Sequence, residues 1–178
     1  EVLALMNQGD DLLQKGQLNE AKQHYQQALD LDNDFDTAKQ KIAIADKKIL
    51  DRAFNKHMSA GFMSMEKRSF TAARQSFNEA LKLKPRSAEA RNALEQTRHN
   101  LTTININSLQ ADAKAQEAQE NWHAAREKYE AALALNSSLA EAQQGQQRTA
   151  LRGKINDRLQ QILSQPERIY DPKVFQET

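Results

Sequence analysis

The sequence predicts an all-α fold built from repeated helical hairpins, and three observations carry this prediction. The phrase NEAKQHYQQALDLD at residues 19–32 returns in similar form at residues 71–84 and again at residues 123–136, so successive copies begin 52 residues apart. The 178 residues include only 5 Gly and 3 Pro, which are too few for the many tight turns of a sheet protein. Only 6% of the residues are aromatic and 39% are hydrophobic, so we expect a thin helical core.

The repeated phrase predicts one helix of about four turns in each copy, because its recurring residues are spaced three or four apart and therefore share one helix face. Those residues are a large apolar side chain, two alanines and an aromatic side chain between the alanines. In chain order of the phrase they are Leu18, Phe70 and Trp122; Ala21, Ala73 and Ala125; Tyr25, Phe77 and Tyr129; and Ala28, Ala80 and Ala132. We expect a neighbouring helix to approach closely at the alanines, since a larger side chain would push it away.

Between the copies of the phrase, the sequence predicts two long helices. Residues 36–67 contain one Gly and no Pro, and residues 88–119 contain neither. We expect each stretch to form a single helix of about 32 residues, which is roughly 48 Å long at 1.5 Å per residue. Residues 101–109, LTTININSL, have low helix propensity. Their alignment with residues 49–57 favours a helix over an isolated strand, although a kink or a local break there stays an alternative.

The C-terminal part of the chain predicts a third long helix and a turn. This helix should begin near Leu139 and end before Pro166, since proline cannot continue it. Residues 166–178 predict a turn followed by the start of another helix at Pro172. We therefore expect a helical repeat domain over residues 1–165. Its expected units are residues 2–52, 53–104 and 105–165, with approximate boundaries.

Small residues at matching places connect these units to a known repeat. The first unit has Gly9 in its expected first helix and Gly16 at its turn, and the second has Gly61 and Pro85. The third unit has Ala113 at the place of the first glycine. Together with the alanine and aromatic pattern, these residues resemble the tetratricopeptide repeat, a helix–turn–helix unit of about 34 residues. The resemblance covers three stretches of about 30 residues, spread over most of the chain.

The spacing of the copies departs from that family. A period of 52 residues exceeds the family's period by about 18 residues, which is five turns of α-helix. Five whole turns return a helix face to its starting direction, so we interpret the extra residues as lengthened helices shared by neighbouring units. The resemblance implies an α-solenoid of about three hairpins and about seven helices.

No residue pattern indicates a catalytic or metal site. The chain has no Cys, and its four histidines are never three or four residues apart. It has no glycine-rich phosphate loop and no Gly-x-Ser-x-Gly motif. The 25 basic and 24 acidic residues balance, and acidic residues interrupt each run of basic ones, which argues against nucleic-acid binding. We therefore predict no catalytic residue, no cofactor, no metal and no nucleic-acid partner.

One stripe of residues could form a partner surface. In arrays of the resembled family, the first helices line a concave groove that holds peptides or partner helices. In the second unit this stretch carries Met58, Phe62 and Met65 on one helix face, and methionine suits adaptable contact surfaces. The matching residues of the other units are Met6 and Asp10 in the first and Gln110 and Lys114 in the third. The alternative is that the stripe packs into the thin core.

Position 62 is expected to be at least partly exposed even so. Its counterparts in the sister units are Asp10 and Lys114, and a site that accepts both charges is seldom buried.

The function that we predict is a non-enzymatic scaffold that binds a peptide or a helix of a partner protein. The alternative is a structural spacer or self-association module, which would make a homo-oligomer, or the soluble part of a membrane-anchored protein. No apolar run approaches the roughly 20 residues of a membrane span. The chain starts at Glu1 rather than Met, so we expect a fragment whose anchor or signal, if any, lies outside it. The sequence is compatible with the cytoplasm and with the bacterial envelope.

Overall fold

The computed structural model describes residues 1–164, and these residues form seven helices and no strand, which confirms the predicted all-α fold class. The helices are α1 (Val2–Gln14), α2 (Leu18–Leu31), α3 (Asp36–Glu66), α4 (Phe70–Leu83), α5 (Ala88–Ala118), α6 (Trp122–Leu135) and α7 (Ala140–Leu163). The turn and helix start predicted for residues 166–178 lie outside the described residues. In residues 1–164, no helix combines the length and the apolar character that crossing a membrane requires.

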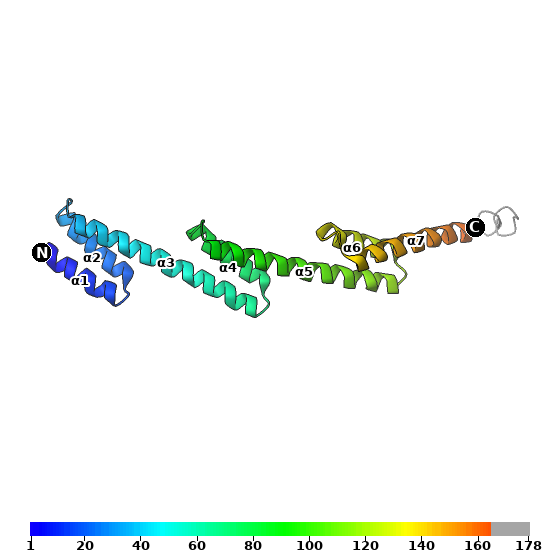
Figure 1. Ribbon diagram of the computed structural model, residues 1–178, viewed down its shortest axis with the longest axis horizontal. Coiled ribbons are helices and arrows are strands. Elements are labelled where there is room, and N and C mark those ends of the chain that lie inside the picture. The colour runs from blue at the N-terminus through cyan, green and yellow to red at the C-terminus, as the bar shows by residue number, and fades with distance from the viewer. Residues whose placement is uncertain (165–178) are drawn as a thin grey trace. The chain divides into compact units, whose positions relative to one another are not determined.

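The chain divides into two compact units, an N-terminal unit of Glu1–Arg98 and a C-terminal unit that begins at His99. In the N-terminal unit, α1 packs against α2, α2 against the first part of α3, and the second part of α3 against α4 (Figure 1). In the C-terminal unit, α6 packs against α7. The division of residues 1–165 into three repeat units stays a prediction.

The three short helices begin at equivalent residues, each one position before the repeated phrase. α2, α4 and α6 start at Leu18, Phe70 and Trp122, and each has 14 residues. The two repeated alanines of each helix and its central aromatic residue are fully buried, as the spacing of three and four predicts.

The turn before each short helix uses one backbone conformation. Gly16, Arg68 and Glu120 occupy the same repeat position and have φ angles of 76°, 55° and 59°. After the first of these, the Gln17 N–H donates to the Leu12 carbonyl at 2.9 Å, as in a Schellman cap, and the other two turns have the equivalent bond. Glycine adopts this left-handed conformation without steric cost, which explains Gly16.

The two long helices are continuous. α3 and α5 each run for 31 residues, so residues 101–109 are helical and no break interrupts them. α7 begins after Leu139 and ends at Leu163, before Pro166, as predicted. The continuity follows from local hydrogen bonding, because a helix satisfies its backbone donors and acceptors within four residues.

Each buried aromatic ring of the short helices lies against a glycine of a neighbouring helix. A methyl group on Gly9 or Gly61 would collide with the ring of Tyr25 or Phe77, both on the following helix. In the third repeat the glycine is Gly145 on α7, where a methyl group would collide with the ring of Tyr129. The three repeats thus share one close approach.

In the third repeat, the glycine beside the ring lies on the helix after it instead of the helix before it. Ala113 takes the place of Gly9 and Gly61 and is buried in the same cluster as Tyr129. Two aligned positions therefore exchange their residues. The second repeat has Gly61 at the first position and Ala93 at the second, whereas the third repeat has Ala113 and Gly145. The sequence pattern alone had marked Ala113 as a departure without finding its counterpart.

Candidate functional site

The methionines of the predicted partner surface lie mainly in the core. Met6 and Met58 are 6% and 4% exposed and belong to the hydrophobic clusters around α2 and α4. Met65 is half-buried, and its Sδ lies 3.4 Å from the Thr97 Oγ1 of α5. Because the core is thin, it includes these long apolar side chains, which are therefore not available to contact a partner.

Phe62 is the member of the stripe that meets solvent with an apolar side chain. It is 41% exposed, as its charged counterparts predicted, and its neighbour Met63 is 56% exposed. The Phe62 ring packs edge-on against Phe77, with ring centroids 5.2 Å apart and an interplanar angle of 69°. This contact packs part of the exposed ring against the core near the end of α3.

The counterpart of Phe62 in the first repeat joins three helices. The Asp10 carboxylate of α1 accepts a hydrogen bond from the Tyr25 hydroxyl of α2 at 2.7 Å and one from the Lys41 ammonium of α3, also at 2.7 Å. The bond from Lys41, and then that from Tyr25, lowers the pKa of Asp10 below its usual value. Burial, with the nearby carboxylate, raises the pKa of Tyr25.

Asp10→Asn is expected to lower the free energy of unfolding by about 0.5–1 kcal/mol at pH 7, a modest amount because Asp10 is partly exposed. The folded pKa of Asp10 is lowered, so its charge stabilises the fold above the unfolded pKa of about 3.9 and ceases to do so as the pH falls through the folded pKa. Urea unfolding at pH 7 and about pH 2 measures this difference, which should be smaller at the lower pH.

Asp11→Asn is the matched control, because Asp11 forms an exposed ion pair with Lys15 within one helix. This control should change the free energy of unfolding by less than about 0.5 kcal/mol at pH 7. A difference between the native chain and Asp10→Asn that persists unchanged at about pH 2 would contradict the charge-based account.

In the third repeat the equivalent positions form ion pairs between α5 and α7. The Lys114 ammonium lies 2.5 Å from the Glu141 carboxylate, and the Arg148 guanidinium donates to Glu117 at 2.7 and 3.0 Å. The bonds from Arg148 lower the pKa of Glu117. Gln110, one turn before Lys114, is half-buried. Asp10 and Lys114 therefore make polar contacts between helices, whereas Phe62 presents an apolar ring.

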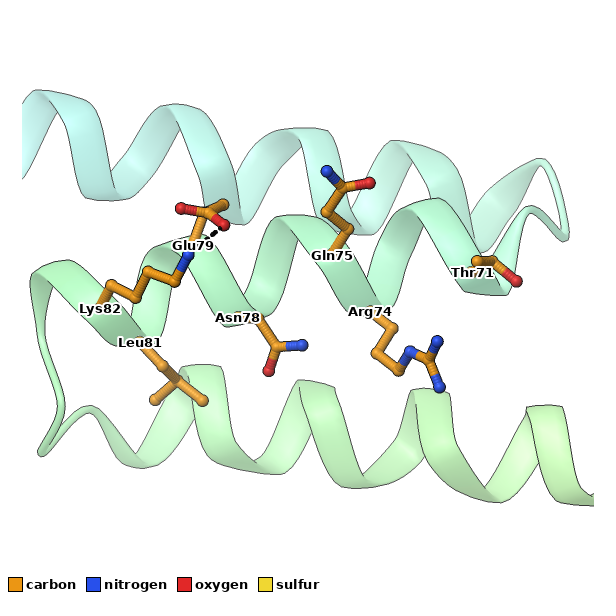
Figure 2. A pocket seen from close by; sticks show the side chains of 7 residues that line it. All are labelled: Thr71, Arg74, Gln75, Asn78, Glu79, Leu81 and Lys82. Atoms are coloured by element: carbon orange, nitrogen blue, oxygen red, sulfur yellow. Dashed lines mark hydrogen bonds and ion pairs between the residues drawn. The ribbon is translucent and has the colours of Figure 1, made fainter.

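A second surface feature is a shallow hollow over the outer face of α4, with a volume of about 650 Å³. It is lined by Thr71, Arg74, Gln75, Asn78, Glu79, Leu81 and Lys82. Figure 2 shows Gln75 and Glu79 on the side of α3, and Arg74 and Asn78 on the side of α5. Lys82 and Glu79 form an ion pair at 2.7 Å. Six of its seven lining residues are polar or charged and none is aromatic, so we regard the Phe62 surface as the better partner site.

The described side chains do not converge into a metal centre. Within residues 1–164, no three His, Cys, Asp or Glu side chains come together in a way that could hold a metal ion.

Comparison with known proteins agrees with the helical hairpins. A family model described as TPR repeat matches residues 9–45, which span the second half of α1, all of α2 and the first turns of α3. No curated protein sequence matches the chain. Repeats of this kind generally mediate protein–protein interactions and form a non-enzymatic type of domain. The resemblance to the tetratricopeptide repeat is thus confirmed for residues 9–45, within the N-terminal unit.

Proposed function

We propose that this chain is a non-enzymatic scaffold that binds a peptide or a helix of a partner protein at the surface around Phe62. The observation that carries the proposal is an aromatic ring that is 41% exposed and held in place by Phe77. A ring that is already held loses little conformational freedom on binding, and aromatic side chains dominate the energetics of protein interfaces.

The surroundings of Phe62 support a contact with an apolar partner side chain. Met63 is exposed beside it, and a flexible thioether can adapt to partners of different shape. Met58 and Met65 belong to the core cluster that contains Phe77, the residue whose ring contacts Phe62. At the equivalent positions of the other repeats the chain has Asp10, Gln110 and Lys114, which would contact polar rather than apolar groups of a partner.

The test compares proteins that the immobilised full chain and its Phe62→Ser variant retain from a lysate of the source cells, quantified by mass spectrometry. A partner should be retained by the native chain and depleted by at least about tenfold with Phe62→Ser, which is about 1.4 kcal/mol of binding free energy. Gln75→Ser, on the outer face of α4, is the control and should retain the partner.

Light scattering of the same samples tests the alternative function. Equal retention by the native chain and Phe62→Ser, together with a dimer or larger assembly in solution, would contradict the proposal and favour a spacer or self-association module.

A further inference from the structure

The second repeat lacks an ion pair that both of the other repeats form at the position of Phe62. In the third repeat the counterpart of Phe62 is Lys114, whose ammonium lies 2.5 Å from the Glu141 carboxylate of α7. In the first repeat the counterpart is Asp10, whose carboxylate lies 2.7 Å from the Lys41 ammonium of α3. Phe62 carries no charge, so the second repeat cannot form a pair of this kind from its own residues.

The second repeat nevertheless has the carboxylate of such a pair. Glu89, in the first turn of α5, aligns with Glu141, which lies 52 residues later in the first turn of α7. The interval from Phe62 to Glu89 is 27 residues, the same as the interval from Lys114 to Glu141. Glu89 is therefore the equivalent of Glu141, with Phe62 in place of the lysine.

The packing of α5 beside α3 follows the same register as that of α7 beside α5. The Thr97 hydroxyl of α5 lies 3.4 Å from the Met65 Sδ of α3. One repeat later, Glu117 of α5 aligns with Met65 and is bound by Arg148 of α7, one residue from the counterpart of Thr97. The sequence alignment is thus also an alignment of contacts, and it brings the Glu89 carboxylate to the edge of the proposed partner surface.

The Glu89 carboxylate has no cation of its own. Its side chain is exposed, and within residues 1–164 it forms no ion pair and no side-chain hydrogen bond. Lys84 and Arg86 line the same hollow as Glu89. The Lys84 ammonium is paired with the Asp51 carboxylate at 2.6 Å, and in this described part of the chain no ion pair joins Arg86 to Glu89. The carboxylate is therefore available to a cation from outside the chain.

The position of Glu89 at the start of a helix does not use up its charge. A carboxylate in the first turn is favoured by the positive end of the helix dipole, and this effect needs no cation. Glu141 is in the first turn of α7 and still binds the Lys114 ammonium. The same two interactions are therefore open to Glu89.

We infer that the Phe62 surface binds a partner segment in which a Lys or Arg lies beside the apolar side chain that contacts Phe62. The partner's cation pairs with Glu89, as Lys114 pairs with Glu141 inside the chain. This inference rests on the function proposed above and adds the charge of the partner to it. An unpaired carboxylate beside the ring also disfavours acidic segments, because like charges at an interface repel each other.

The experiment first selects ligands from a random peptide library displayed on phage, with the immobilised full chain and its Phe62→Ser variant in parallel. Peptides that the native chain recovers and Phe62→Ser loses should be enriched in Lys or Arg next to an apolar residue by at least about threefold over the unselected library. A set that depends on Phe62 but is neutral or acidic would overturn the inference and leave the proposed function standing. Recovery of no peptide that depends on Phe62 would contradict both.

The most enriched peptide and its Lys-to-Gln version then test the contact with Glu89. Fluorescence anisotropy with the full chain should show that this replacement weakens binding by about threefold to fivefold, the range of an exposed ion pair, and that added salt reduces the loss. With Glu89→Gln the same replacement should weaken binding by less than about 1.5-fold, because the carboxylate is gone. With Glu89→Lys the Gln version should bind more tightly than the Lys version.

Glu127→Gln is the matched control for Glu89→Gln. Glu127 is an exposed residue of α6 that forms no ion pair in the described residues 1–164, and its replacement should leave the loss from the Lys-to-Gln peptide unchanged. Each comparison uses two peptides on one folded variant, so a lower melting temperature of Glu89→Gln does not affect it. An equal loss on the native chain and on Glu89→Gln would show that the peptide cation does not contact Glu89, and it would overturn the inference.

Discussion

Met58→Ala is expected to lower the free energy of unfolding by about 2–5 kcal/mol. Met58 is 4% exposed and packs with Phe54, Phe77 and Leu94 in one of the two core clusters of the N-terminal unit. Truncation removes the buried thioether and leaves a cavity, because the surrounding helices relax only partly. Urea unfolding of the full chain, followed by circular dichroism, measures the change.

The free energy of unfolding lost by Phe62→Ser, one helical turn away, is compared with that lost by Met58→Ala to separate an exposed side chain from a buried one. The Phe62 ring is partly exposed, so the variant should lose only about 0.5–1.5 kcal/mol, the typical value of one aromatic pair. A loss from Phe62→Ser as large as that from Met58→Ala would place the ring in the core and remove the basis of the partner site. A loss of less than about 1 kcal/mol from Met58→Ala would contradict its burial.

Gly145→Ala is expected to cost about 1–3 kcal/mol. The added methyl group would collide with the ring of Tyr129, which is fully buried and has no room to swing outwards. Alanine favours the helix by about 1 kcal/mol relative to glycine, so a net loss of stability would show that the collision outweighs helix propensity. Thermal unfolding of the full chain is the measurement.

Ala113→Gly is the rescue variant for Gly145→Ala. The double variant places glycine and alanine as the second repeat has them, at Gly61 and Ala93, and lets the Tyr129 ring move towards α5. We therefore expect the double variant to be more stable than the sum of the two single changes, by a coupling free energy of about 0.5–2 kcal/mol. Strictly additive losses would show that the two positions do not share one ring.

The exchange of glycine and alanine also shows why the third repeat departs from the family pattern. One glycine beside the ring gives the close helix approach, and either flanking helix can supply it. A pattern that assigns glycine to the first helix finds Gly9 and Gly61 but misses Gly145, which lies 32 residues after Ala113. The compensation is a contact between distant residues, so no local signal reveals it.

The sequence by itself determined the helices of this protein. The spacing of three and four placed the buried face of α2, α4 and α6, and the lack of proline made α3 and α5 continuous. These features depend on hydrogen bonds and steric contacts between residues at most four apart, and such local interactions are written directly in the order of the residues.

The tertiary structure decided which other side chains of the helix face that carries Phe62 are buried. The charged counterparts of Phe62 predicted its exposure, whereas the sequence left open whether Met58 lines a surface or packs in the core, and the structure buries it. α7 likewise has four apolar residues spaced as on one helix face, Leu151, Ile155, Leu159 and Leu163, and all four are exposed. Exposure is set by how closely and at what level neighbouring helices pack, and this is a property of residues far apart in the chain.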